Sequence, residues 1–245
     1  MYDWITTRSD REHTGNHTLK GETTAINIDL KGRTPPPFIA VEGPIGVGKT
    51  TLAKKLAASF NCSTLLEGAE DNPFLERFYR NRKQAALATQ LFFLFERAQK
   101  IQDMRQADIF EPVRVSDFLI EKDPLFARIN LEQDEFQLYQ KVYQQMTIDA
   151  PRPDLVIYLQ ASTDVLLSRI DSRGIPFEQA IDKAYLERLN EVYSEFFLYY
   201  DGAPLLIVNA SQIDLVNGEA DYRQLVDYLL DIRSGRHYFN PTFFG

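Results

Sequence analysis

The sequence contains very little cysteine and histidine. Its 245 residues include one cysteine, Cys62, and three histidines. A single thiol cannot form an internal disulfide, and one thiol with three scattered histidines cannot make a structural zinc site. This usage is typical of proteins in a reducing compartment, so we expect a cytoplasmic location.

Basic residues and long apolar runs are also scarce. Lysine and arginine number 27 against 35 aspartates and glutamates, which gives a formal net charge of −8 at pH 7. Because nucleic acids and anionic membranes bind to broad basic surfaces, neither is expected as a partner. No apolar run approaches the roughly 18 residues that a membrane span needs. Residues 1–30 hold no signal-peptide core and too many acids for a transit peptide.

The rest of the composition is that of a folded protein. Apolar residues make up 44% of the chain and charged residues 25%, which is ordinary for a globular domain. Residues 1–36 are polar and rich in threonine, and they include prolines that favour extended backbone. We predict a flexible N-terminal arm there, followed by one domain over residues 37–245.

Short apolar runs alternate with helical patterns along this domain. Five buried strands separated by helices predict an α/β fold with a five-stranded parallel sheet flanked by helices. The aromatic residues within 237–244 are assigned to no strand and are expected to pack on the domain or on a partner. The predicted strands cover residues 38–41, 64–66, 113–117, 155–159 and 205–208, and the predicted helices cover 84–106, 136–148 and 222–232 and begin at 163 and 183.

The strongest motif is a glycine-rich loop between the first predicted strand and the next helix. It matches G-x4-G-K-[ST], the phosphate-binding loop, in the strand-loop-helix context that the motif requires. Backbone amides and the helix N-terminus surround the phosphates, Lys49 reaches the β- and γ-phosphates, and Thr50 can hold Mg²⁺. We therefore predict ATP and Mg²⁺ as cofactors, with nucleotide-binding residues Gly43, Pro44, Ile45, Gly46, Val47, Gly48, Lys49, Thr50 and Thr51.

A phosphate-binding loop alone does not distinguish kinases from GTPases or motor ATPases. The N-K-x-D motif with which GTPases read guanine is missing, and no apolar strand ends in the Asp-Glu pair of many ATPases. A small-molecule kinase of P-loop type is therefore favoured.

Two further patterns lie downstream of the loop. Glu67 ends the second predicted strand and is followed by Glu-Asp-Asn-Pro-Phe-Leu at residues 70–75. Gln90 and Arg97 are seven residues apart on one predicted helix, which places both on the same face. With these motifs, residues 38–232 resemble the deoxynucleoside kinase family, most closely its bacterial deoxyadenosine kinase-like branch.

The resemblance implies transfer of the ATP γ-phosphoryl group to the 5′-hydroxyl of a deoxynucleoside. The expected substrate is deoxyadenosine, another purine deoxynucleoside or deoxycytidine. Glu67 is then the general base, Lys49 is the phosphate-bound lysine, and Asp117 holds Mg²⁺ together with Thr50. Arg169 and Arg173, four residues apart on one helix face, would close on the transferring phosphates from a lid near residues 169–180.

The resemblance also implies how the nucleoside binds. Gln90, Arg97 and Asp123 would read the edge of the base, and an aspartate at this position favours bases that carry an amino group. Tyr79 and Glu178 would contact the sugar 3′-hydroxyl. Relatives are commonly dimers, so a homodimer is expected.

Two positions depart from the family pattern. Phe118 stands where the family carries an arginine that orients the catalytic glutamate, and Ile175 stands where related lids carry a third arginine. Either another cation reaches Glu67, with Arg97 and Arg169 the nearest candidates, or the enzyme is slow; we expect a functional but modest kinase. Two alternatives remain at this point: a nucleoside monophosphate kinase, and a non-catalytic binding or assembly protein of the same fold.

Overall fold

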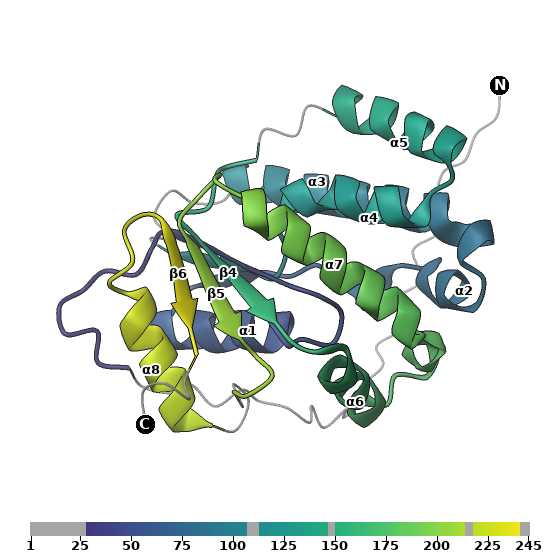
Figure 1. Ribbon diagram of the computed structural model, residues 1–245. Coiled ribbons are helices and arrows are strands. Elements are labelled where there is room, and N and C mark those ends of the chain that lie inside the picture. The colour runs from purple at the N-terminus through teal and green to yellow at the C-terminus, as the bar shows by residue number, and fades with distance from the viewer. Residues whose placement is uncertain (1–27, 107–112, 147–149, 214–217, 241–245) are drawn as a thin grey trace, which may run out of the picture.

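Six parallel strands form the central sheet of this protein, whose computed structural model describes residues 28–106, 113–146, 150–213 and 218–240 (Figure 1). Across the sheet the strand order is β2-β3-β1-β4-β5-β6, and each strand pairs with its neighbour in parallel. Along the chain the strands are β1 (Phe38–Glu42), β2 (Ser63–Leu65), β3 (Arg114–Ser116), β4 (Leu155–Gln160), β5 (Leu205–Asn209) and β6 (Arg236–Phe239).

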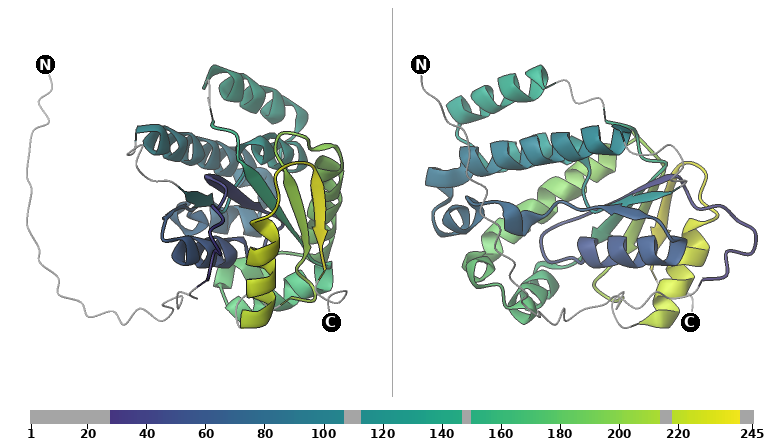
Figure 2. Two further views of the ribbon diagram at one scale, coloured as in Figure 1. Left: turned by 90° about the vertical axis from the view of Figure 1, so that its left-hand side faces the viewer. Right: turned by 180° about the vertical axis from the view of Figure 1, so that it is seen from behind.

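Helices cover both faces of the sheet, which is why the central strands are continuously apolar. In β4, Leu155 and Ile157 belong to the core beneath α1 and α8, whereas Val156 and Tyr158 belong to the core beneath α7. Figure 2 shows α1 and α7 on opposite sides of the sheet. The helices are α1 (Lys49–Phe60), α2 (Leu75–Arg80), α3 (Arg82–Gln106), α4 (Asp123–Asn130), α5 (Gln133–Gln145), α6 (Thr163–Arg173), α7 (Lys183–Tyr199) and α8 (Glu219–Leu229).

The predicted α/β class with a parallel sheet flanked by helices is confirmed, but the predicted number of five strands is wrong. The sixth strand, β6, lies at the sheet edge beside β5. Its residues Arg236, His237 and Tyr238 are partly or fully exposed and only Phe239 is buried. Because one side of an edge strand faces water, it does not read as an apolar run.

Most predicted helices are shifted by a few residues. The helix expected at 136–148 begins earlier, at Gln133, because Glu132 and Glu135 form a reciprocal capping box at its N-terminus. The helix expected at 222–232 is α8, whose last helical residue is Leu229. Such boundaries depend on caps, which the apolar period does not reveal.

Both ends of the described part of the chain contact α8 or its neighbours. Most of the predicted arm, residues 1–27, lies outside the described residues. Its described end is anchored, since Arg33 forms ion pairs with Asp227 and Asp231 of α8. Part of the aromatic tail is β6, and residues 241–245 lie outside the described residues.

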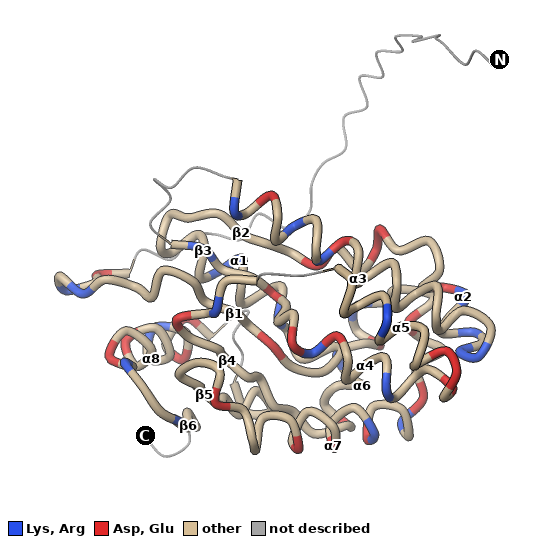
Figure 3. Tube along the Cα trace, turned by 90° about the horizontal axis from the view of Figure 1, so that it is seen from above, with Lys and Arg blue, Asp and Glu red and all other residues tan. Residues whose placement is uncertain are grey.

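Charges of both signs are distributed over the described elements. Lysine and arginine are interspersed with aspartate and glutamate along the described helices in the view of Figure 3. Within the described ranges, no helix is long and apolar enough to cross a membrane.

Candidate active site

The glycine-rich loop leaves the end of β1 and enters α1 through left-handed backbone. Gly46 has φ 82° and Gly48 has φ 104°, a region that side chains disfavour. A Cβ atom on Gly46 would also lie 2.8 Å from the Ile170 side chain of α6. The loop therefore needs glycine both for its turn and for its close packing against α6.

Lys49 is folded back onto this loop. Its Nζ donates hydrogen bonds to the carbonyl oxygens of Gly43 at 2.8 Å and Pro44 at 3.2 Å. Burial, followed by the positive charge of Lys122, lowers the pKa of Lys49. A bound anion would therefore stabilise the charged ammonium group of Lys49.

The two predicted lid arginines lie beside the loop. Arg169 and Arg173 share a cavity of about 510 Å³ with residues 46–51. Arg169 donates to the carbonyl oxygens of Val47 at 3.1 Å and Ala210 at 2.6 Å, and Arg173 forms an ion pair with Glu178 at 2.7 Å. Both guanidinium groups come from α6, which is followed by Gly174 as its C-cap in a left-handed conformation.

Asp117 connects the loop to the next strand end. Its carboxylate accepts hydrogen bonds from the Thr50 hydroxyl and, at 2.7 Å, from the backbone amide of Glu67. The side chain is 3% exposed, and burial raises its pKa. The predicted metal residues Thr50 and Asp117 are thus adjacent, directly beside the predicted base.

Glu67 lies between cations at the carboxyl end of β2. Its Oε1 atom accepts hydrogen bonds from Nε and Nη2 of Arg97, and it lies 3.2 Å from Nζ of Lys122. Burial alone would raise the pKa of Glu67, but Arg97, Lys122 and Lys49 outweigh burial and hold it far below its usual value. The carboxylate is ionised at neutral pH.

A second buried carboxylate stands on the other side of Lys122. Glu42, the last residue of β1, is fully buried and accepts hydrogen bonds from the amide of Gly43, the amide of Leu119 and the hydroxyl of Tyr193. Its two oxygens lie 3.3 and 3.4 Å from Nζ of Lys122. Glu42 thereby fixes the start of the phosphate-binding loop.

Two of the three predicted base-reading residues, Arg97 and Asp123, meet between α3 and α4, and the third, Gln90, is buried on α3. Nη1 of Arg97 lies 2.8 Å from Oδ2 of Asp123, which is completely buried. Gln90 is 3% exposed, and no described residue donates a hydrogen bond to its buried Oε1. Tyr139 of α5 is also buried, and the negative charge of Asp123 is one cause of its raised pKa, after burial.

The two predicted sugar-contacting residues also lie near one another. Tyr79 of α2 stacks on Phe177, with ring centroids 6.1 Å apart and planes at 10°. Glu178 follows Phe177 in the turn after α6 and is 8% exposed. Burial raises the pKa of Tyr79 well above its usual value, and the negative charge of Glu178 adds to this effect.

Comparison with known proteins agrees with this arrangement. Residues 39–232 match the family model of deoxynucleoside kinases. The chain belongs to the deoxynucleoside kinase family. The Bacillus subtilis deoxyguanosine kinase is 36% identical over 204 residues, which cover 80% of this chain and 97% of that protein. The B. subtilis deoxyadenosine/deoxycytidine kinase is 30% identical over 205 residues, which cover 80% and 92%.

Solved structures of deoxynucleoside kinases have the same fold. The structure of the M. mycoides deoxyadenosine kinase with the products dCMP and dCDP superposes with a TM-score of 0.69 at 26% identity. The match covers 80% of this chain and 100% of that chain. The predicted family is therefore confirmed, and this deoxynucleoside kinase is an ATP-dependent enzyme that phosphorylates deoxynucleosides. The alternatives of a monophosphate kinase and of a non-catalytic protein find no support among these relatives.

Sequence reasoning missed a buried cation of this candidate site, Lys122. It stands between Glu121 and Asp123, and a run of three charged residues normally indicates a solvated turn. The signal that could have found it is charge balance. Several carboxylates were predicted at neighbouring strand ends, and such a cluster needs more buried cations than Lys49 and Arg97.

Proposed function

We propose that this kinase transfers the ATP γ-phosphoryl group to the 5′-hydroxyl of a purine deoxynucleoside or of deoxycytidine, with Glu67 accepting the hydroxyl proton. The observation that carries the proposal is the position of Glu67. Its backbone amide bonds to Asp117, which bonds to Thr50 of the phosphate-binding loop, while its carboxylate contacts Arg97 of the base-reading group. Glu67 therefore joins the phosphate side of the site to the nucleoside side.

The low pKa of Glu67 fits a late proton transfer. A 5′-hydroxyl is far less acidic than a carboxyl group, and in a loose transition state it gives up its proton as the bond to phosphorus forms. An ionised carboxylate orients the hydroxyl by accepting its hydrogen bond from the outset and takes the proton afterwards. Lys49, Arg169 and Arg173 supply positive charge on the side of the phosphoryl group.

The residues present fit the Mg²⁺ ion that we propose as cofactor. Thr50 and Asp117 offer a hydroxyl and a carboxylate oxygen, the hard donors that Mg²⁺ prefers, and Mg²⁺ commonly binds through one or two such groups together with phosphates and waters. When bound, the ion would neutralise charge that develops on the phosphate oxygens. Among the described residues, no group of three or more histidine, cysteine, aspartate or glutamate side chains could hold a metal ion by itself.

Amino-bearing bases are the proposed substrates because of Gln90 and Asp123. Asp123, paired with Arg97, offers carboxylate oxygens, which accept hydrogen bonds from amino groups, and the Gln90 amide both accepts and donates. With ATP and Mg²⁺, we expect deoxyadenosine, deoxyguanosine or deoxycytidine to have a higher kcat/KM than thymidine. A panel assay with the four deoxynucleosides measures this, and thymidine as the best substrate would refute the assignment of the base-reading group.

A variant of Gln90 tests the same group from the protein side. Gln90→Ala is expected to lower kcat/KM for the deoxynucleoside, because polar groups of the bound base lose their partner. The lost stabilisation of the transition state should be roughly 1–3 kcal/mol. The KM for ATP should change little. Gln99→Ala is the matched control, since Gln99 lies on the same helix and is exposed. Equal losses for both substrates would place Gln90 outside the base site.

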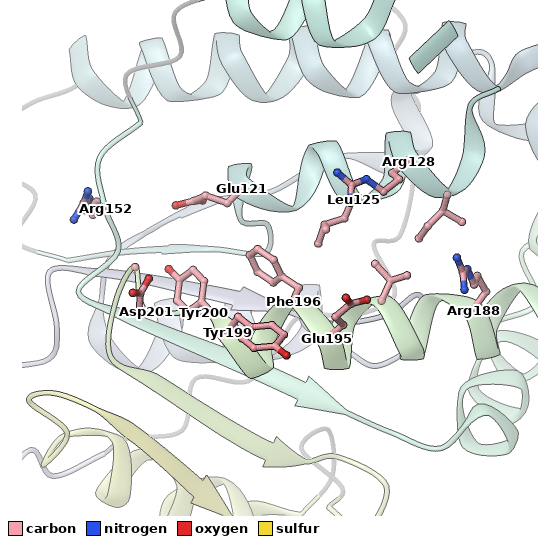
Figure 4. A pocket seen from close by; sticks show the side chains of 13 residues that line it. Glu121, Leu125, Arg128, Arg152, Arg188, Glu195, Phe196, Tyr199, Tyr200 and Asp201 are labelled. Carbon is pink, nitrogen blue, oxygen red and sulfur yellow. The ribbon is translucent and has the colours of Figure 1, made fainter. Parts of the chain in front are cut away.

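A groove between α4 and α7 supports the proposed homodimer. The groove has a volume of about 960 Å³ and is lined by apolar residues such as Leu125, Phe196 and Tyr199 together with charges of both signs (Figure 4). Tyr199 is 77% exposed and its neighbour Leu198 is 61% exposed. Large apolar side chains on one helix favour association, which sedimentation velocity can measure. The cytoplasmic location stays a prediction.

A further inference from the structure

We propose that Lys122 is a positioning residue for phosphoryl transfer, which fixes the Glu67 carboxylate by binding it together with Glu42. This inference rests on the proposed function, in which Glu67 accepts the proton of the 5′-hydroxyl. It adds a residue that lies in neither the phosphate-binding loop nor the base-reading group. Lys122 enters the site from the short helical turn Ile120–Lys122 that follows β3 and precedes α4.

Lys122 contacts two carboxylates, one at the end of β1 and one just beyond β2. Its Nζ lies 3.2 Å from Oε1 of Glu67 just beyond β2 and 3.3 Å from Oε2 of Glu42 at the end of β1. Because β3 separates β2 from β1 in the sheet, the lysine spans the gap between two non-adjacent strand ends. The Glu42 carboxylate also accepts the amide of Gly43, so one ammonium group connects the proposed base to the phosphate-binding loop.

Burying the charge of Lys122 costs free energy unless carboxylates compensate that charge. Lys122 is 2% exposed, and a buried ammonium group without a partner would lose its charge. Burial lowers its pKa, but Glu42 and Glu67 more than offset that effect and raise the pKa above its ordinary value. Because Lys122 is buried and contacts two carboxylates, its positive charge interacts with the proposed base and not with solvent.

Arg97 cannot fill the same role alone. It divides its donors between Glu67 and Asp123, and it belongs to the group proposed to meet the nucleobase. A bound base therefore competes for Arg97. Lys122 instead lies between the two strand ends, with the ring of Phe126 5.6 Å from its Nζ, and it can stay on Glu67 throughout the reaction.

The position of Phe118 explains why the cation comes from elsewhere. The Phe118 side chain is 3% exposed and packs with Ile101 and Ile120 in a separate apolar cluster. Position 118 therefore contributes no charged side chain to the site. Four residues later the chain turns Lys122 inward, so the site has a second cation on Glu67 in addition to Arg97.

Three single variants give the first test, with kcat measured per folded protein using ATP, Mg²⁺ and the best deoxynucleoside of the panel. Lys122→Met is expected to lower kcat roughly tenfold to a hundredfold, as expected for a misplaced reacting group, with little change in the KM for ATP. Lys122→Arg should restore most of the loss, because it keeps a cation between the carboxylates. Lys55→Met is the matched control, since Lys55 is also a buried lysine but contacts the Tyr222 ring of α8.

A double-mutant cycle with Glu67 separates positioning from a merely structural role. If Lys122 acts through Glu67, Lys122→Met should cost almost nothing further in a Glu67→Gln background. Additive losses, or a wild-type kcat in Lys122→Met, would overturn the inference while leaving the role of Glu67 intact. A wild-type kcat in Glu67→Gln itself would overturn the proposed function instead.

A second variant keeps the test valid if Lys122→Met does not fold. Lys122→Met combined with Glu42→Gln removes one positive and one negative buried charge together, so it relieves the unpaired carboxylate. The double variant is expected to fold and still to lose kcat, with the loss again absent when Glu67 is glutamine. A folded double variant with the kcat of Glu42→Gln alone would contradict the inference.

Discussion

Replacing Lys49 by alanine is expected to lower kcat by at least about a hundredfold, the loss typical of removing one preorganised charge from a transition state. Lys49 is the loop cation placed to meet the β- and γ-phosphates. The variant should stay folded, because burial lowers the pKa of Lys49 and its charged form therefore gains nothing from the folded state without a nucleotide. Steady-state kinetics with ATP and the best deoxynucleoside measure the loss.

The matched control for this variant is Lys54→Ala. Lys54 lies on the same helix, α1, but is exposed. Its replacement should leave kcat at the wild-type level. A folded Lys49→Ala enzyme that keeps more than a tenth of the wild-type kcat would show that the loop does not hold the transferring phosphates.

Glu67→Gln is expected to lower kcat by roughly two to four orders of magnitude, the usual contribution of a positioned proton acceptor. The amide keeps the size of the side chain but cannot take a proton. The KM for the deoxynucleoside should change much less than kcat. The fold should survive, because Arg97 keeps its ion pair with Asp123 and Lys122 keeps its contact with Glu42.

Glu76→Gln provides the control for that substitution. Glu76 lies on α2, is 57% exposed and pairs with Arg80 on the surface, where an ion pair contributes little. It should leave both kinetic constants unchanged. If Glu67→Gln weakens only nucleoside binding and leaves kcat intact, Glu67 is a binding residue and another group accepts the proton.

Local motifs made the phosphate side of the site predictable. The loop from Gly43 to Thr50 has a fixed spacing because its glycines, its lysine and its hydroxyl all act on the phosphates of one nucleotide, and the helix that follows begins at Lys49. Arg169 and Arg173 could be paired from sequence because one helix carries both. In each case the residues that act together are close in the chain.

Contacts between distant segments were harder to predict. Gln90 and Arg97 could be placed on one face of a helix, but the pairing of Arg97 with Asp123 came only from the family resemblance. The contact of Arg97 with Glu67 was one of two possibilities left open at position 118. Lys122 was missed because its burial depends on a short turn between β3 and α4, and no periodic pattern marks such a turn. The strand β6 was missed because its half-exposed residues resemble a loop.

The order of the strands has a consequence for how this protein folds as it is synthesised. β1 lies early in the sequence, yet its residue Ile39 pairs with Leu155 of β4. Similarly, Leu205 of β5 pairs with Arg236 of β6. Such parallel pairings between distant segments form slowly, since the chain must close long loops first. The edge of β1 that pairs with β4 therefore stays open on the ribosome until β4 has emerged, and the sheet is complete only after β6, which ends at Phe239, has emerged.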